Sequence, residues 1–360
     1  MIISLKDADN LTLDKIKTVA ADILGQPIRR VERMTGGGNS KVYRLMAEDL
    51  KLYVFKLYFS HEEDPRDRVG NEFSSLLFLW NNGLRHIPRP VAMNRDQGCA
   101  VYEFVEGEKI NTRDVNAQEM DEALDFLTTL KELRNKTATH QFARASEACF
   151  SAKEAVTNIQ SRLEKLMSQE NKGDGYDELR AYLHHDFIPF FEVLTGWGQE
   201  RYREHHWFFD TDISISQRVL SPSDFGFHNA IRGPSGRIVF LDFEYFGWDD
   251  PAKMIADFLL HPAMNLGEDL KRRFAVKVYD IFVEDDHLER RAAVLYPFFG
   301  LKWCLIFLNE FLPGGLKRRG WEMPSHADRK EIRQKQLLKA RNMLSKMKET
   351  YKEFPYHRCN

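Results

Sequence analysis

The sequence predicts an α+β protein with two lobes, a small lobe built on an antiparallel sheet and a larger lobe that is mainly helical. Strand-like segments gather before residue 107 around one long helix, whereas helical periodicity dominates after it. A chain of 360 residues is long enough for two such lobes, each with its own core. We therefore place the first lobe at residues 1–102, a hinge at 103–107 and the helical lobe at 108–360.

The elements of the first lobe follow from apolar spacing and from turn residues. A helix is predicted over residues 12–25, because Thr12 is a favourable N-cap and Gly25 a favourable stop. A longer helix is predicted over residues 62–83, where large apolar residues recur at helical spacing. Five β-like segments accompany these helices: 28–34, 41–47, 51–59, 87–93 and 99–107.

The second lobe is predicted to be helical, with one β-hairpin inside it. Helical patterns fill residues 115–206 and resume after residue 251, and the hairpin pattern lies between them at 217–251. The apolar segment 294–308 is shorter than a membrane span and contains Pro297 and Gly300. We therefore expect no stable insertion into a membrane.

The net charge indicates which classes of partner to expect, and the positions of the cysteines bear on the cellular location. The net charge of −2 argues against a nucleic-acid partner. Residues 316–360 nevertheless carry thirteen Lys or Arg against five Asp or Glu. This stretch predicts a charged helix packed on the lobe, or alternatively a weak contact with an anionic membrane surface. The four cysteines form no Cys-x-x-Cys pair and no signal-peptide pattern opens the chain, so a cytoplasmic location is the default expectation.

Three features of the first lobe favour contact with phosphate. Gly36, Gly37 and Gly38 follow one another between two strands, where backbone N–H groups can approach an anion closely. Lys56 lies in the middle of an apolar strand, where burial without a partner is costly. Glu72, in the following helix, is a candidate partner that would aim the ammonium group at phosphate oxygens.

Three residues around the hairpin of the second lobe complete this pattern. Asp224 and Asn229 lie five residues apart in the loop 221–229. Asp242 ends the second strand of the hairpin and lies in the segment 241–251. The hairpin returns Asp242 to the side of Asn229, and a carboxamide beside a carboxylate offers the hard oxygen ligands that Mg²⁺ prefers. Asp224 would then face the same cavity and accept or orient a hydroxyl proton.

Each of these residues also has a purely structural interpretation. A glycine-rich turn between strands is usually only a turn, a strand lysine often faces water, and Asp and Asn are ordinary loop residues. Their order along the chain is what favours the functional interpretation.

This order resembles the aminoglycoside phosphotransferase and choline kinase group, which shares the protein-kinase-like fold. The resemblance spans roughly residues 31–257. MTGGGNSKVYRL resembles the nucleotide loop, VFKLY the strand with the ATP-binding lysine, and VYEFVEG the hinge that contacts adenine. SPSDFGFHN is similar to the catalytic loop, and VFLDFEYFGWDDP is similar to the metal-binding segment.

The resemblance implies a role for each matching residue. Lys56 would contact the α- and β-phosphates of ATP and Glu72 would orient it. Asp224 would be the catalytic base, while Asn229 and Asp242 would bind Mg²⁺.

Further roles follow from the same resemblance. The Glu103 carbonyl and the Val105 amide would meet the adenine edge. Asp257 would brace the catalytic loop, and Glu244 would lie near a second metal ion or the substrate. The implied reaction is transfer of the γ-phosphate to a hydroxyl group of a small molecule such as a sugar, an amino alcohol or an aminoglycoside.

The loop departs from the family pattern at one position. The family's usual loop begins His-Gly-Asp, whereas Pro222 and Ser223 precede Asp224 here. Because the missing histidine supports the loop and is not the base, we expect an active kinase. A pseudokinase that binds nucleotide without transfer is the alternative. A protein kinase is disfavoured because the sequence has no Ala-Pro-Glu motif after the metal-binding segment.

Overall fold

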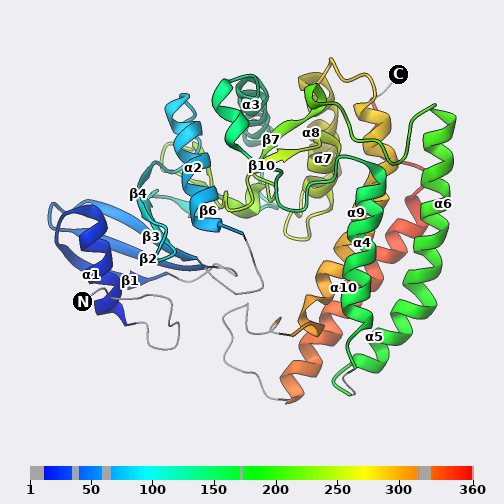
Figure 1. The fold of residues 1–360 in the computed structure, drawn as a ribbon, viewed down its shortest axis with the longest axis horizontal. Helices are drawn as coiled ribbons and strands as arrows, with labels where there is room; N and C mark the ends of the chain where they lie inside the picture. The colour runs from blue at the N-terminus through cyan, green and yellow to red at the C-terminus, as the bar shows by residue number, and fades with distance from the viewer. Residues whose placement is uncertain are drawn as a thin grey trace.

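The computed structural model describes residues 12–34, 40–58, 66–170, 173–313, 315 and 326–358. A sheet-containing lobe stands at one end of the molecule and a helical lobe at the other (Figure 1). The predicted α+β class, with a small antiparallel sheet followed by a larger helical part, is confirmed.

The small lobe contains a five-stranded antiparallel sheet in the order β1-β2-β3-β5-β4. Its strands are β1 (Ile28–Arg33), β2 (Ser40–Ala47), β3 (Leu52–Tyr58), β4 (Pro90–Asn94) and β5 (Cys99–Glu103). β2 and β3 form the hairpin that their short connection predicts. All five predicted strands are therefore present, most of them a residue or more shorter than their sequence pattern.

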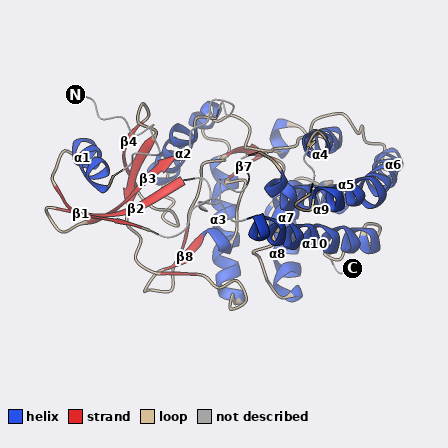
Figure 2. Cartoon of the chain, turned by 90° about the horizontal axis from the view of Figure 1, so that it is seen from below, coloured by secondary structure: helices blue, strands red, loops and turns tan. Residues whose placement is uncertain are grey.

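One helix packs on each face of this sheet (Figure 2). The helices are α1 (Leu13–Leu24) and α2 (Arg68–Asn81). Side chains alternate between the two faces along β3, so Phe55 joins Ile16 of α1 in one core while Tyr58 joins Leu76 of α2 in the other. The same alternation turns Lys56 toward α2, because it lies an even number of residues from Tyr58.

The larger lobe consists of helices around two small antiparallel sheets. Its helices are α3 (Ala117–Leu133), α4 (Ala152–Met167), α5 (Tyr176–Tyr182), α6 (Ile188–Glu204), α7 (Pro251–Leu260), α8 (Glu268–Ile281), α9 (Leu288–Phe307) and α10 (His326–Thr350). Its strands are β6 (Glu108–Lys109), β7 (Val219–Ser221), β8 (Ala230–Arg232), β9 (Ile238–Phe240) and β10 (Gly247–Asp249). β8 and β9 form the predicted hairpin, β6 pairs with β8, and β10 pairs with β7. These pairings hold the loop after β7 and the segment after β9 in fixed positions.

Helix α9 is longer than the sequence predicts. Helical structure runs from Leu288 to Phe311 through Pro297 and Gly300, beyond both ends of the apolar segment 294–308. By length and composition alone this helix would be able to cross a membrane, but 78% of its apolar window is buried within the protein. Along α10 the buried residues include Leu344 and Met347, which share the core with α9, as the packed-helix interpretation of the basic stretch predicts.

Two glycines of α6 give a matched test of this packing. A Cβ added at Gly198 would lie 2.8 Å from the Cζ atom of Phe298, which is buried in α9, whereas a Cβ at Gly196 would meet nothing within 4 Å. We expect Gly198→Ala to lower the free energy of unfolding by about 1–3 kcal/mol through overpacking. Gly196→Ala should raise it by up to about 1 kcal/mol, because alanine favours the helix. Denaturant titration of both variants checks the pair, and equal effects would contradict the close approach of α6 and α9.

Candidate active site

Lys56 lies at the centre of a buried group of charges between β3, α2 and the segment after β9. Its Nζ atom donates to Glu72 Oε2 at 2.7 Å and to Asp242 Oδ1 at 2.8 Å. The lysine and glutamate side chains are only 11% and 5% exposed, whereas that of Asp242 is 37% exposed. Burial alone would lower the pKa of Lys56, but Asp242 and Glu72 outweigh it and raise that pKa well above its usual value. The predicted Lys–Glu pair is therefore formed, and the ammonium group is charged.

Glu72 is held by more than the lysine. Its Oε2 atom also accepts from the Tyr58 hydroxyl at 2.7 Å, and Oε1 accepts from the backbone N–H of Phe243 at 3.2 Å. The Tyr58 and Tyr102 hydroxyls lie 2.6 Å apart on adjacent strands. Three groups thus hold the carboxylate that orients Lys56, and Tyr102 supports one of them, which leaves the ammonium little freedom to turn away.

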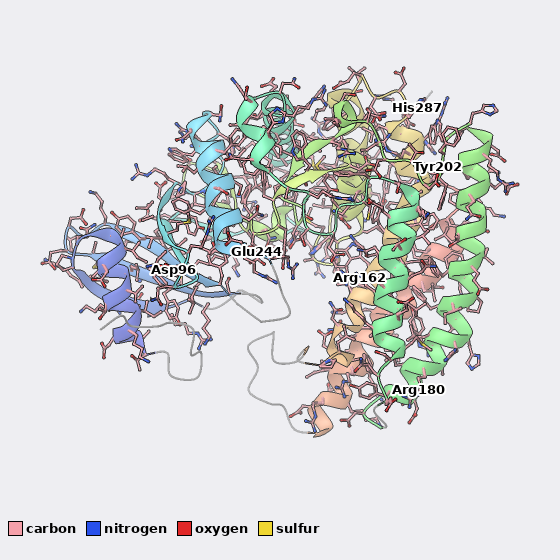
Figure 3. The ribbon with its side chains drawn as sticks, in the orientation of Figure 1. Asp96, Arg162, Arg180, Tyr202, Glu244 and His287 are labelled. Atoms are coloured by element: carbon pink, nitrogen blue, oxygen red, sulfur yellow. The ribbon has the colours of Figure 1, made fainter. Side chains whose placement is uncertain are left out.

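Asp242 adopts a backbone conformation that is unusual for a non-glycine residue. Its φ is 67°, in the left-handed region, which costs on the order of 1–3 kcal/mol and is typically retained at functional sites. The neighbouring Glu244 accepts from Arg68 Nη1 at 2.9 Å and is 3% exposed. Glu244 lies at the foot of α2, between the sheet and the helical lobe (Figure 3). Burial and the charge of Asp242 raise the pKa of Glu244.

The loop between β7 and β8 presents Asp224. Ser223 has a φ of 68°, its Oγ donates to the Ser146 carbonyl at 2.8 Å, and its N–H donates to Ser221 Oγ at 3.0 Å. The Asp224 N–H donates to the Pro222 carbonyl at 2.9 Å. Pro222 thus stands where the family has histidine, and local backbone contacts fix the loop around it.

Three side chains surround the Asp224 carboxylate. Oδ1 lies 3.0 Å from His228 Nε2 and 3.7 Å from His261 Nε2, while Oδ2 accepts from Asn229 Nδ2 at 3.2 Å. Burial would raise the pKa of Asp224, but the contacts with the two histidines and Asn229 lower it to about 2. The carboxylate is therefore ionised at neutral pH and able to accept a hydrogen bond from a hydroxyl group.

Asn229 and Asp242 are brought together through their backbones. The Leu241 N–H donates to the Asn229 carbonyl at 2.8 Å, which sets the residue before Asp242 beside Asn229, as the predicted hairpin requires. The amide nitrogen of Asn229 is used by Asp224, so its Oδ1 atom remains for another partner. An amide oxygen and a partly exposed carboxylate are a chemically suitable pair of donors for Mg²⁺.

The remaining predicted site residues have different outcomes. Gly36, Gly37 and Gly38 lie outside the described residues. Glu103 ends β5 and Val105 follows in the segment that leaves the sheet, so their contacts with adenine stay predictions.

Asp257 contacts a different partner from the one expected. Its carboxylate lies 3.0 Å from Lys253 Nζ and 3.2 Å from Lys302 Nζ, within the helical lobe. The Lys302 pair joins α7 to α9, whereas Lys253 lies on α7 itself, and among the described residues no bond from Asp257 to the catalytic loop is recorded.

Sequence reasoning missed the residues that support the site. Tyr58 follows Lys56 by two positions, so strand periodicity already places it on the same face. His228 stands directly before Asn229, but His261 and Tyr102 reach the site only through tertiary packing.

The comparisons with known proteins agree with this geometry. Residues 30–190 match the model of a phosphotransferase enzyme family. A spectinomycin phosphotransferase solved with ADP and spectinomycin has a TM-score of 0.65 and 11% identity, covering 94% of this chain and 99% of its own. The choline kinase LicA from Streptococcus pneumoniae has a TM-score of 0.58 and 16% identity, with 92% and 98% covered. An amicoumacin kinase solved with AMP-PNP and Ca²⁺ has a TM-score of 0.57 and 17% identity, with 97% and 98% covered.

At such identities the solved structures establish the fold, and the family model adds the class. A sequence comparison with curated proteins gives no match. The family match gives the class of the protein as a phosphotransferase, and its structural neighbours give it the protein-kinase-like fold. The predicted resemblance to the aminoglycoside phosphotransferase and choline kinase group is thereby confirmed.

Proposed function

We propose that the protein is an ATP- and Mg²⁺-dependent kinase that phosphorylates a hydroxyl group of a small molecule. The observation that carries the proposal is the position of Lys56 Nζ, 2.7 Å from Glu72 and 2.8 Å from Asp242, which lies 186 positions away in the sequence. This contact joins the phosphate-binding lysine of one lobe to the metal-binding carboxylate of the other. The conformations of Asp242 and of the loop that presents Asp224 support the same role.

The chain's own residues supply positioning and charge. Lys56 would neutralise the phosphates of ATP, with Glu72 fixing its direction. Asn229 Oδ1 and Asp242 would hold Mg²⁺, which, when bound, offsets the charge of the transferred phosphate. Asp224 would orient the acceptor hydroxyl and receive its proton.

The aromatic residues near the site do not favour a quaternary ammonium acceptor. The ring of Tyr245 already has the guanidinium groups of Arg66 and Arg68 within 5.5 Å, and Phe246 is only 1% exposed. Trp303 forms a T-shaped pair with His261, at 4.8 Å between ring centres. The cation–π box that such a ligand needs is therefore not assembled from these residues.

Charges beside the catalytic loop favour an acceptor that is not a polycation. Glu147, which follows the residue bonded to Ser223, lies 2.7 Å from Arg162. Asp257 is paired with Lys253 and Lys302. Because these carboxylates are already neutralised, we propose an uncharged or anionic polyol, such as a sugar, as the acceptor class.

The test is a screen of purified hydroxyl compounds. The protein would be incubated with ATP and Mg²⁺, and each compound would be analysed by mass spectrometry for the gain of one phosphate. The proposal predicts transfer to at least one sugar or polyol. ATP binding without transfer to any compound would favour the pseudokinase alternative, and phosphate on added protein would favour a protein kinase.

Metal removal should abolish this transfer. EDTA is expected to stop turnover, added Mg²⁺ to restore it, and Asp242→Ala to remove the response to Mg²⁺, because one of the two proposed ligands is lost. The measurement is the initial rate against Mg²⁺ concentration. Turnover of the wild type in EDTA, or an Asp242→Ala variant with the wild-type Mg²⁺ dependence, would contradict the metal assignment.

A further inference from the structure

Two histidines that the proposed chemistry leaves without a role lie against Asp224. His228 Nε2 is 3.0 Å from Asp224 Oδ1, and His261 Nε2 is 3.7 Å from the same atom. Their side chains are only 12% and 15% exposed. His228 comes from the catalytic loop, whereas His261 follows the C-terminal end of α7, so two separate elements direct imidazole groups at one oxygen.

The two rings form a stack that fixes the position of His228. The ring centres of His228 and His261 are 3.7 Å apart with an interplanar angle of 12°, and Trp303 packs edge-on against His261. Gly226 also lies close to this ring, since a Cβ at that position would lie 2.8 Å from His228 Nδ1. The His228 ring thus packs against His261 and Gly226, and the polar partner recorded for it among the described residues is the Asp224 carboxylate.

Hydrogen bonding determines which ring nitrogen carries the proton. His261 Nδ1 accepts from the Ala263 N–H at 3.2 Å, so the ring proton of His261 is on Nε2. His228 Nε2 lies 3.0 Å from a carboxylate oxygen and donates to it, while its Nδ1 is buried without a hydrogen-bond partner among the residues that the structure describes. Both imidazoles therefore direct an N–H toward Asp224 Oδ1.

We infer that His228 and His261 are positioning residues of the transfer reaction, and that they take over the support that the usual loop histidine would give at position 222. His228 donates to Oδ1 and Asn229 donates to Oδ2, which fixes the plane of the Asp224 carboxylate. The second lone pair of Oδ2 then faces the acceptor hydroxyl. His261 acts through His228 by holding its ring in the stack.

A metal site formed by the same three residues is less consistent with the contacts. A metal ligated by His261 Nε2 would need the ring proton on Nδ1, where it would oppose the Ala263 N–H. The geometry thus favours two imidazole donors over two imidazole ligands.

The inference rests on the proposed kinase function, so one arm of its test is independent of turnover. Long-range ¹H–¹⁵N NMR spectra of histidine-labelled protein report the tautomer of each ring. The signals would be assigned with His228→Gln and His261→Phe. We expect the Nε2–H form for both histidines, and a change in the His228 signal in Asp224→Ala. A protonated Nδ1 on His261, or a His228 signal that Asp224→Ala leaves unchanged, would overturn the inference.

The second arm compares variants that keep or remove the donor. His228→Leu should lower kcat by about 10- to 100-fold with little change in the KM for ATP, because only the carboxylate is misplaced. His228→Gln, whose amide N–H reaches the Nε2 position, should recover most of that loss. His261→Phe keeps the ring stack but removes the Nε2–H, so its kcat should fall less than that of His228→Leu, whereas His261→Ala should resemble His228→Leu.

The outcomes separate the inference from the proposed function. A wild type that phosphorylates no acceptor would defeat the proposed function and leave the NMR arm to decide the inference. A wild type that turns over, with His228→Leu equally active or His228→Gln as impaired as His228→Leu, would defeat the inference alone. Thermal melting of each variant identifies a loss of folded protein, and a kcat change that follows only the folded fraction would also overturn it. Zn²⁺ binding that requires both histidines and inhibits the wild type would likewise overturn the inference.

Discussion

Asp224→Asn is expected to lower kcat by about 10²- to 10⁴-fold while nucleotide binding remains close to wild type. The substitution keeps the size of the side chain but replaces one carboxylate oxygen with an amide NH₂ group and removes the negative charge that would receive the hydroxyl proton. Among the described residues Lys56 bonds to Glu72 and to Asp242 rather than to Asp224, so the phosphate-binding side should be unaffected. Initial rates with the identified acceptor and the Kd for an ATP analogue give the two measurements.

A surface carboxylate provides the control for this variant. Asp212 is 46% exposed and pairs with Arg218 outside the site, so Asp212→Asn should keep the wild-type kcat. An Asp224→Asn variant within tenfold of the wild-type kcat would mean that another group handles the acceptor hydroxyl.

Lys56→Met should have the second large effect, on both stability and activity. It leaves Glu72 buried without its cation, and breaking a buried ion pair in this way costs about 3–5 kcal/mol. It also removes the positive charge that would meet the phosphates. We expect a large fall in kcat/KM for ATP together with a lower free energy of unfolding, measured by denaturant titration.

A second substitution separates these two consequences. In a Lys56→Met background, Glu72→Gln removes the unpaired charge, so part of the lost stability should return while activity stays low. A double variant that recovers activity along with stability would show that Lys56 serves only the fold. An unchanged stability of Lys56→Met would contradict the buried pair.

Much of the fold was predictable because the spacing of apolar residues indicates which segments are helices or strands and which face each of them buries. The alternation of side chains along β3 places Lys56 and Tyr58 on one face, and the spacing of α2 turns Glu72 toward that face. The length of α9 was not predictable in this way, since helical structure extends beyond both ends of the apolar segment 294–308.

The residues of the candidate site likewise fall into those that local sequence predicts and those that only tertiary packing brings together. Residues that act within one loop or one hairpin, such as Asp224 and Asn229, were predictable from their spacing. His261 was not, because it lies 37 positions beyond Asp224 and approaches it only when α7 packs beside the catalytic loop. Tyr102 likewise reaches Tyr58 through the pairing of β5 with β3.

The most direct test of the central claim is a structure of the protein with Mg²⁺ and a non-hydrolysable ATP analogue. The claim is that Lys56, Asn229, Asp242 and Asp224 form one phosphate-transfer site. It predicts Lys56 Nζ on the α- and β-phosphates, Mg²⁺ between Asn229 Oδ1 and Asp242, and the γ-phosphate directed toward Asp224. A nucleotide bound elsewhere, or bound with Lys56 still paired to Asp242 and no metal on Asn229, would contradict it.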